Sequence, residues 1–175
     1  MTENQTVHDL LTRRSVRAYQ KRQVDEDALA QIIEAARYAP TAMGRQDVHL
    51  VVLQDPAEIA NLSRMNAAVM GADTDPFYGA PTVVVVLADA SFGPAVCDGS
   101  LALGNMMNAA HALGVASCWI HRAKEEFDGA EGKALLAKWG VPEGNWLGVG
   151  HCILGYAEGP EPQAKPRKPG FVTRV

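Results

Sequence analysis

The sequence predicts one domain of the α/β or α+β class, and three observations predict it. Its 175 residues lie within the usual size of a single domain. Of these residues, 47% are hydrophobic and 21% are charged, which is typical of a globular protein. Segments with the apolar spacing of helices alternate with short segments rich in β-branched residues. Because no linker or internal repeat divides them, we expect residues 1–175 to form a single domain.

The first forty residues predict two helices. The first is short, carries apolar residues with helical spacing and ends near Arg14. The second begins after Asp25, a residue type favoured at helix N-termini, and ends before Pro40. The apolar positions of the two helices are Val7, Leu10, Leu11, Leu29, Ile32, Ile33 and Ala36.

The middle of the chain predicts two strands with a helix and a loop between them. Residues 48–53 are rich in β-branched side chains and indicate a strand, after which Pro56 opens a helix that extends to about Ala68. Gly, Asp, Thr and Pro dominate residues 71–76, a composition typical of a loop. Residues 82–87 are almost all valine and leucine, which predicts a central strand covered on both faces.

The last part of the chain predicts two more helices and two more strands. A long helix over 98–113 ends at Gly114, and residues 116–120 form a short strand. A helix over 131–139 is followed by a strand over 146–156. Residues 160–175 are rich in Pro, Lys and Arg and cannot build a core of their own, so this tail must dock on something if it is ordered.

Composition argues against several functional classes. A net charge of −4, from 16 Lys and Arg against 20 Asp and Glu, provides no basic field to hold nucleic acid. No apolar run reaches the roughly 18 residues that cross a bilayer, and residues 1–13 lack the apolar core of a secretion signal. We therefore expect a cytoplasmic protein without a membrane partner. Three cysteines make no disulfide framework, and we interpret them as buried apolar groups: Cys97, Cys118 and Cys152.

Common catalytic motifs are absent from the sequence. It has no phosphate-binding loop, no G-x-S-x-G and no H-E-x-x-H. Residues 148–150 do not begin a dinucleotide motif, because Ile153 stands where the third glycine belongs. A metal site is a weak alternative to core packing, because neighbouring residues of a strand face opposite ways. Its candidate ligands would be Cys118, His121 and either His151 or Cys152.

Basic residues gather in two clusters that lie far apart in the sequence. The first contains three arginines and a serine hydroxyl within five residues, which suits a phosphate together with a second anionic centre. Both clusters could converge on one anion, or each could be a solvated surface. The first cluster is Arg13, Arg14, Arg17, Lys21 and Arg22, with Ser15 between them, and the second is Lys165, Arg167, Lys168 and Arg174.

Several motifs follow one another in a characteristic order. They are Arg13–Arg17 with the aromatic Tyr19, Ala35–Thr41, Phe77–Pro81, Asp98–Gly114, Ser117–Ile120, Leu154–Tyr156 and Lys165–Arg167. In this order they resemble the nitroreductase family of flavin mononucleotide (FMN) enzymes, and the resemblance covers nearly the whole chain. It implies an α+β nitroreductase-like fold with a central mixed sheet flanked by helices. It also implies a homodimer with flavin sites at the interface.

The resemblance further implies a role for each candidate site residue. Arg13, Arg14 and Ser15 would hold the FMN phosphate and ribityl chain, with Lys165 and Arg167 closing over the phosphate from the tail. Arg17 would lie at the flavin N1/O2 edge, where its charge favours the reduced state. Gln46 and Asn66 would face the pyrimidine edge, Trp119, Ile120 and His121 would lie beside N5, and Pro40, Thr41 and Ala42 would reach the flavin of the other subunit.

Two departures from the family pattern affect these expectations. Gly44 and Asp47-Val48 replace residues common in the family, so one hydrogen bond to the pyrimidine edge is expected to be lost. His121 stands where a glycine usually lies beside flavin N5. It could narrow the substrate site, donate a proton as a catalytic residue, or simply face outward.

The resemblance thus predicts an FMN-dependent oxidoreductase. Electrons would pass from NADH or NADPH through flavin N5 to a small acceptor, namely a nitroaromatic, quinone or enone. Since the cofactor performs the difficult step, no catalytic triad is needed. The alternative is a flavin-binding storage, sensing or partner-reduced protein that does not turn over nicotinamide.

Overall fold

A four-stranded antiparallel sheet forms the centre of this computed structural model, which describes residues 4–175. Residues 1–3, part of the predicted domain, lie outside the described residues. The strand order is β1-β2-β4-β3, and the strands are β1 (Val48–Leu53), β2 (Thr82–Asp89), β3 (Ala116–Ile120) and β4 (Trp146–Gly155). The expectation of a mixed sheet is wrong for these strands, because every pair is antiparallel. A parallel pairing occurs as an isolated bridge between Ser15 and Ser117.

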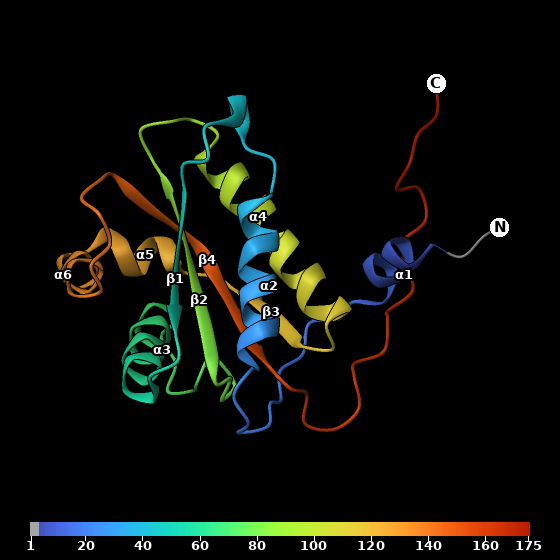
Figure 1. Ribbon diagram of the computed structural model, residues 1–175, viewed down its shortest axis with the longest axis horizontal. Coiled ribbons are helices and arrows are strands. Elements are labelled where there is room, and N and C mark those ends of the chain that lie inside the picture. The colour runs from blue at the N-terminus through green and yellow to red at the C-terminus, as the bar shows by residue number, and fades with distance from the viewer. Residues whose placement is uncertain (1–3) are drawn as a thin grey trace.

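Helices cover both faces of the sheet and enclose two hydrophobic clusters (Figure 1). Helices α2 (Glu26–Arg37) and α4 (Ala95–Ala112) lie on one face, and α3 (Pro56–Met70), α5 (Ala123–Asp128) and α6 (Ala130–Lys138) lie on the other. Along β2, alternate valines enter opposite clusters, so Val83 and Val85 face one layer and Val84 and Val86 face the other. The prediction of a central strand buried on both faces is therefore confirmed.

Most predicted elements occur within a few residues of their expected bounds. The two strands over 48–53 and 116–120 match, whereas α4 begins at Ala95, three residues before the predicted start. Helix α5 and a single 3₁₀ turn, η1 (Ala42–Gly44), were not predicted. Asp25 does occupy the N-cap of α2, but its carboxylate binds Arg22 and Tyr156 instead of capping the helix.

Two glycines of β4 allow close approach of neighbouring elements. A Cβ atom on Gly148 would lie 2.2 Å from the carbonyl oxygen of Ala123, so α5 rests directly on the strand. A Cβ atom on Gly150 would lie 2.4 Å from Nε1 of Trp119 on β3. Gly148 and Gly150 do not belong to a dinucleotide motif. They are needed because a side chain at either position would collide with a neighbouring element.

The N-terminal helix and the C-terminal tail extend away from the sheet (Figure 1). Helix α1 (Gln5–Thr12) has no buried residue and exposes Val7, Leu10 and Leu11. Residues 160–175 contain no helix or strand and are exposed throughout, including Phe171. The apolar side chains of both segments are thus at least half exposed within the described chain.

None of the helices found in residues 4–175 is both long and apolar enough to cross a membrane.

Candidate functional site

The arginine-rich segment is fixed against the outer edge of β3. The backbone N–H of Val16 donates a 3.0 Å hydrogen bond to the carbonyl of Ser117, beside the Ser15–Ser117 bridge. The buried Tyr19 donates its hydroxyl proton to the Val16 carbonyl at 2.7 Å, and burial raises the pKa of this phenol above its usual value. The turn that carries Arg13, Arg14 and Arg17 is therefore a structured part of the sheet edge.

The three arginines of this segment have no carboxylate partner among the described residues. Nη1 of Arg13 is buried and makes no hydrogen bond. Arg14 donates from Nη1 to the carbonyls of Leu11 and Arg13, and the Arg17 guanidinium lies 5.9 Å from the centre of the Tyr78 ring. Because buried polar groups are almost always satisfied, an unpaired Arg13 nitrogen indicates a site for an external anion.

Several arginines outside this segment are neutralised within the chain. Four of them form ion pairs with a carboxylate: Arg22 with Asp25, Arg37 with Glu34, Arg45 with Asp47 and Arg64 with Glu131. Arg22 also stacks on the Tyr156 ring at 4.3 Å, so it does not join the predicted first cluster. Arg13, Arg14 and Arg17 differ from these four arginines because none of the three has a carboxylate partner among the described residues.

The other end of β3 leads into a turn that also carries predicted residues. Ile120 is buried, Trp119 is half-buried, and His121 is exposed with its ring 5.5 Å from the Trp119 ring. Asn66 of α3 is fully buried and donates from Nδ2 to the His121 carbonyl at 2.8 Å. The segment from Arg13 to Arg17 thus lies along the outer edge of β3, and the segment from Trp119 to His121 forms the end of that strand and the start of the turn after it.

Asn66 also binds Arg122, which no sequence motif singles out. Its Oδ1 accepts a 2.9 Å hydrogen bond from Nε of Arg122, which immediately follows His121. Asn66 therefore has one N–H and one lone pair left for the expected contact with a pyrimidine edge. Nothing in the local sequence distinguishes Arg122 from an ordinary surface arginine.

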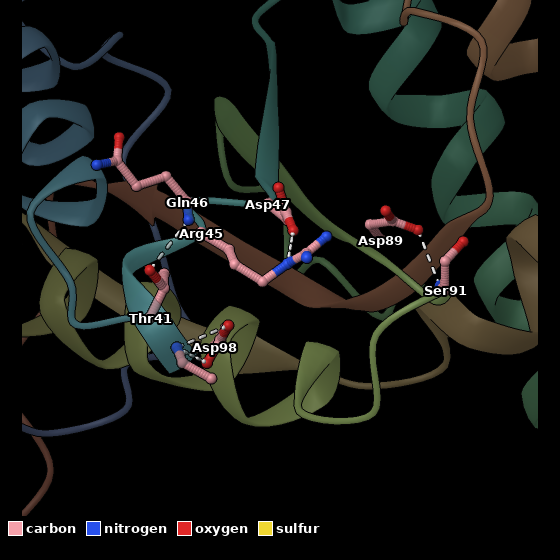
Figure 2. Close-up of polar contacts among 8 residues, drawn as sticks. Thr41, Arg45, Gln46, Asp47, Asp89, Ser91 and Asp98 are labelled. Atoms are coloured by element: carbon pink, nitrogen blue, oxygen red, sulfur yellow. Dashed lines mark hydrogen bonds and ion pairs between the residues drawn. The ribbon is translucent and has the colours of Figure 1, made fainter.

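The predicted residues between 40 and 46 form a second group in the segment between α2 and β1, which Asp98 of α4 holds in place (Figure 2). The backbone N–H of Ala42 donates to both carboxylate oxygens of Asp98, at 3.0 and 3.2 Å. The N–H of Gln46 donates to Oγ1 of Thr41 at 3.0 Å, and Gln46 has a positive φ of 60°. Pro40, Thr41 and Gln46 line a cavity of about 730 Å³ with the end of α2 and β1.

The two groups lie at opposite ends of α4. The hydroxyl of Thr12, next to Arg13, lies 2.8 Å from Nε2 of His111 near the C-terminal end of the helix. Asp98, which holds Ala42, lies in its first turn. With a rise of about 1.5 Å per residue, these two anchors are about 20 Å apart along the helix axis. A single chain therefore does not bring the two groups together.

The tail residues form no contact that joins them to the arginine segment. Lys165 and Arg167 are exposed, and neither makes a hydrogen bond or ion pair with another described residue. The predicted convergence of the two basic clusters stays a prediction.

Two further features lie outside the predicted site. A larger cavity of about 850 Å³ separates α3 from residues 72–81, and none of the predicted site residues lines it.

Two of the three cysteines, Cys118 and Cys152, are buried as expected, and burial raises the pKa of the Cys152 thiol to about 12. Cys97 is exposed, so the interpretation of all three cysteines as buried groups is wrong for this one. Residues 4–175 contain no group of His, Cys, Asp and Glu side chains arranged to hold a metal ion.

Known proteins share both the sequence pattern and the fold. The Nitroreductase family pattern matches residues 10–73 and 70–156. A protein of Archaeoglobus fulgidus named putative NADH dehydrogenase/NAD(P)H nitroreductase is 32% identical over 152 residues, covering 84% of this chain and 82% of the relative. A nitroreductase with bound FMN from Bacteroides fragilis is 33% identical, with a TM-score of 0.91 over 99% of this chain and 100% of that one. A second FMN-bound nitroreductase, from Desulfitobacterium hafniense, is 25% identical, with a TM-score of 0.88 over 99% and 100% of the two chains. The predicted nitroreductase-like α+β fold is confirmed.

Proposed function

The chain belongs to the nitroreductase family, and on that basis we propose that it is an FMN-dependent oxidoreductase that passes electrons from NADH or NADPH to a small organic acceptor. The acceptor class is a nitroaromatic, a quinone or an enone. The observation that carries the proposal is the cluster of arginines without carboxylate partners beside β3, with Nη1 of Arg13 buried and unsatisfied. With three free cysteines and no disulfide among the described residues, we further propose a cytoplasmic location.

The residues present fit the phosphate of FMN. Arg13 and Arg14 offer charged donors at the edge of β3, and the half-buried Ser15 adds a hydroxyl between them and Arg17. Arg17 is exposed and supplies a positive charge that would favour the reduced form of a flavin bound next to it. FMN, when bound, supplies the hydride and electron chemistry, and the protein supplies binding, orientation and charge.

We further propose a homodimer in which each site combines residues of two chains. Pro40, Thr41 and Ala42 would contact a flavin held by the arginine segment of the partner, because α4 keeps the two groups of one chain about 20 Å apart. Tyr38 and Met43 support this arrangement, since both are large, apolar and mostly exposed beside the 40–42 segment. Light scattering of the flavin-loaded protein at micromolar concentration should give the mass of a dimer.

The function is tested by the spectrum of the purified protein, followed by anaerobic addition of NADH or NADPH. We expect the absorption bands of oxidised flavin, one FMN per chain, and rapid bleaching by at least one of the two nicotinamides. A flavin that binds but is not bleached by either would instead favour a storage, sensing or partner-reduced protein. A preparation that stays colourless after incubation with FMN would refute both.

Removal of the tail tests whether Lys165 and Arg167 help to hold the phosphate. A chain that ends after Pro160 should fold but lose FMN, because each charge-assisted contact contributes about 1.5–3 kcal/mol when shielded from water. The loss should increase with salt. The matched control ends after Gly170 and keeps both cations while it removes the exposed Phe171. Full retention of FMN by the shorter chain during gel filtration in high salt would show that the tail is only a solvated end.

His121 is expected to influence the choice of acceptor and not the retention of FMN. Its exposed ring lies beyond the C-terminal end of β3, whereas Arg13 and Arg14 lie near the start of the strand, so a change to glycine should open space near the turn. His121→Gly should therefore raise kcat/KM for bulky acceptors relative to small ones. The proposed place of His121 is wrong if the variant releases FMN while the relative rates of the remaining holoenzyme stay unchanged.

A further inference from the structure

Arg122 adopts a backbone conformation that is rare for a residue with a side chain. Its φ of 80° and ψ of 3° lie in the left-handed region, where glycine is normally found. The residue sits between the end of β3 and the start of α5, and its carbonyl accepts a 3.1 Å hydrogen bond from the N–H of Glu126. A strained position of this kind is retained where the surrounding structure requires it, and such positions gather at binding sites.

The guanidinium of Arg122 is fixed at one nitrogen and uncommitted at the others. Nε donates to Oδ1 of the buried Asn66 at 2.9 Å, and Nδ2 of the same side-chain amide donates to the His121 carbonyl. Within residues 4–175, neither Nη1 nor Nη2 has a hydrogen-bond acceptor, and Arg122 forms no ion pair. The neutral Asn66 therefore orients a positive charge without neutralising it.

This charge lies at the opposite end of β3 from the arginines that fit the phosphate. Six arginines of residues 4–175 lack a carboxylate partner, and two of them, Arg167 and Arg174, lie in the exposed tail. The other four are Arg13, Arg14, Arg17 and Arg122, and they all border β3 or its ends. Arg13 and Arg14 belong to the proposed phosphate and ribityl end, and Arg17 is assigned to the N1/O2 edge of the flavin ring. Arg122 adjoins Trp119 and His121, where the proposed function places the reacting part of the flavin, so its free nitrogens are available to a molecule that enters there.

We propose that Arg122 is a specificity residue that binds a carboxylate of the electron acceptor, so that the preferred substrates are small aromatic acids that carry the reducible group. The two Nη atoms of a planar guanidinium match the two oxygens of a carboxylate. Asn66 holds the side chain in place before the acceptor binds, which reduces the ordering cost of binding. This inference rests on the proposed FMN-dependent function and narrows its substrate class.

A pair of acceptors that differ only in charge tests the inference on the FMN-loaded protein. With NADH or NADPH as donor, 4-nitrobenzoate should show at least a tenfold higher kcat/KM than 4-nitrobenzamide, mainly through a lower KM. Two electrons and two protons convert the nitro group of either compound to a nitroso group and water, so the chemistry at the reacting end is the same. Arg122→Gly, which suits the left-handed backbone, should remove the preference by raising KM for the acid alone. Arg122→Lys should retain part of it.

Arg64→Gln is the matched control, because it removes a positive charge from α3 at an exposed residue paired with Glu131. It should leave the preference unchanged. Calorimetric titration with benzoate and benzamide, neither of which is reduced, supplies a second readout: benzoate should bind at least tenfold more tightly to the parent protein and lose this advantage in Arg122→Gly.

The possible failures are distinguishable. If the bound flavin is not reduced by NADH or NADPH while benzoate still binds through Arg122, the proposed function fails and the carboxylate site stands. If both nitro compounds are reduced with equal kcat/KM and Arg122→Gly changes neither, the inference is overturned while the proposed function stands. An effect of Arg122→Gly confined to the KM of the nicotinamide would also overturn it.

Discussion

Replacement of Glu126 by alanine is expected to lower the free energy of unfolding by about 3–5 kcal/mol. Glu126 on α5 and His151 on β4 are both fully buried, and Oε2 of the carboxylate lies 2.5 Å from Nε2 of the ring. The rings of Phe77 and Phe127 lie 5.3 and 6.3 Å from the His151 ring. Because His151 is enclosed by these apolar rings, it would stay buried without a partner if Glu126 were removed. A loss of this size is a large part of the 5–15 kcal/mol by which domains are typically stable.

Urea unfolding at saturating FMN measures the effect and keeps the stabilisation by cofactor equal between variants. Glu125→Ala is the matched control, because it removes the exposed carboxylate next to Glu126 on the same helix and should change stability by less than about 0.5 kcal/mol. Glu126→Gln, which preserves shape and one acceptor, should lie between the two. Equal stability of Glu126→Ala and Glu125→Ala would show that the buried pair contributes nothing.

Replacement of Arg13 by glutamine should weaken FMN binding roughly ten- to a hundredfold. The reason is that the Nη1 atom of Arg13 is buried without a partner, so a phosphate would gain a charged hydrogen bond that costs the protein no existing contact. Titration of apoprotein with FMN, followed by flavin fluorescence, measures the change. Arg22→Gln is the control, since Arg22 is paired with Asp25 outside the site and should leave the Kd unchanged.

Riboflavin sharpens this experiment, because it lacks the phosphate but retains the ring and ribityl chain. The parent protein should bind riboflavin more weakly than FMN, and Arg13→Gln should leave the riboflavin Kd unaltered. If the variant weakens both ligands by the same factor, Arg13 supports the fold of the segment and does not contact a phosphate.

The fold was predictable where one physical signal dominates. Strand β2 is an unbroken apolar run, and burial on both faces is the state that such a run requires. Helix α5 gave no such signal, because it has only six residues and one of its three buried positions is a glutamate. Glu126 is buried only because His151, twenty-five residues later, supplies a partner, and a single sequence does not reveal such a pairing.

The candidate site was predictable only in part for a similar reason. Residue type and proximity in the sequence identified Arg13, Arg14 and Arg17 as groups for an anion. The sequence did not show that Ala42 and Thr12 are held at opposite ends of α4, because the anchors Asp98 and His111 lie far from them along the chain. Arg122 was missed because its significance lies in a backbone angle and in the absence of a carboxylate, neither of which has a signature in the sequence.

The length of α4 also determines how defects should combine in cells. In the proposed twofold dimer, each site takes its arginine segment from one chain and its 40–46 segment from the other. Suppose that one gene copy encodes Arg13→Gln with Arg14→Gln, and a second encodes Asp98→Ala, which releases Ala42. Each homodimer would have two defective sites, but a mixed dimer would have one site with both defects and one with none. Random assembly of equal amounts would therefore restore about a quarter of the sites. Two inactive alleles would together give an active strain.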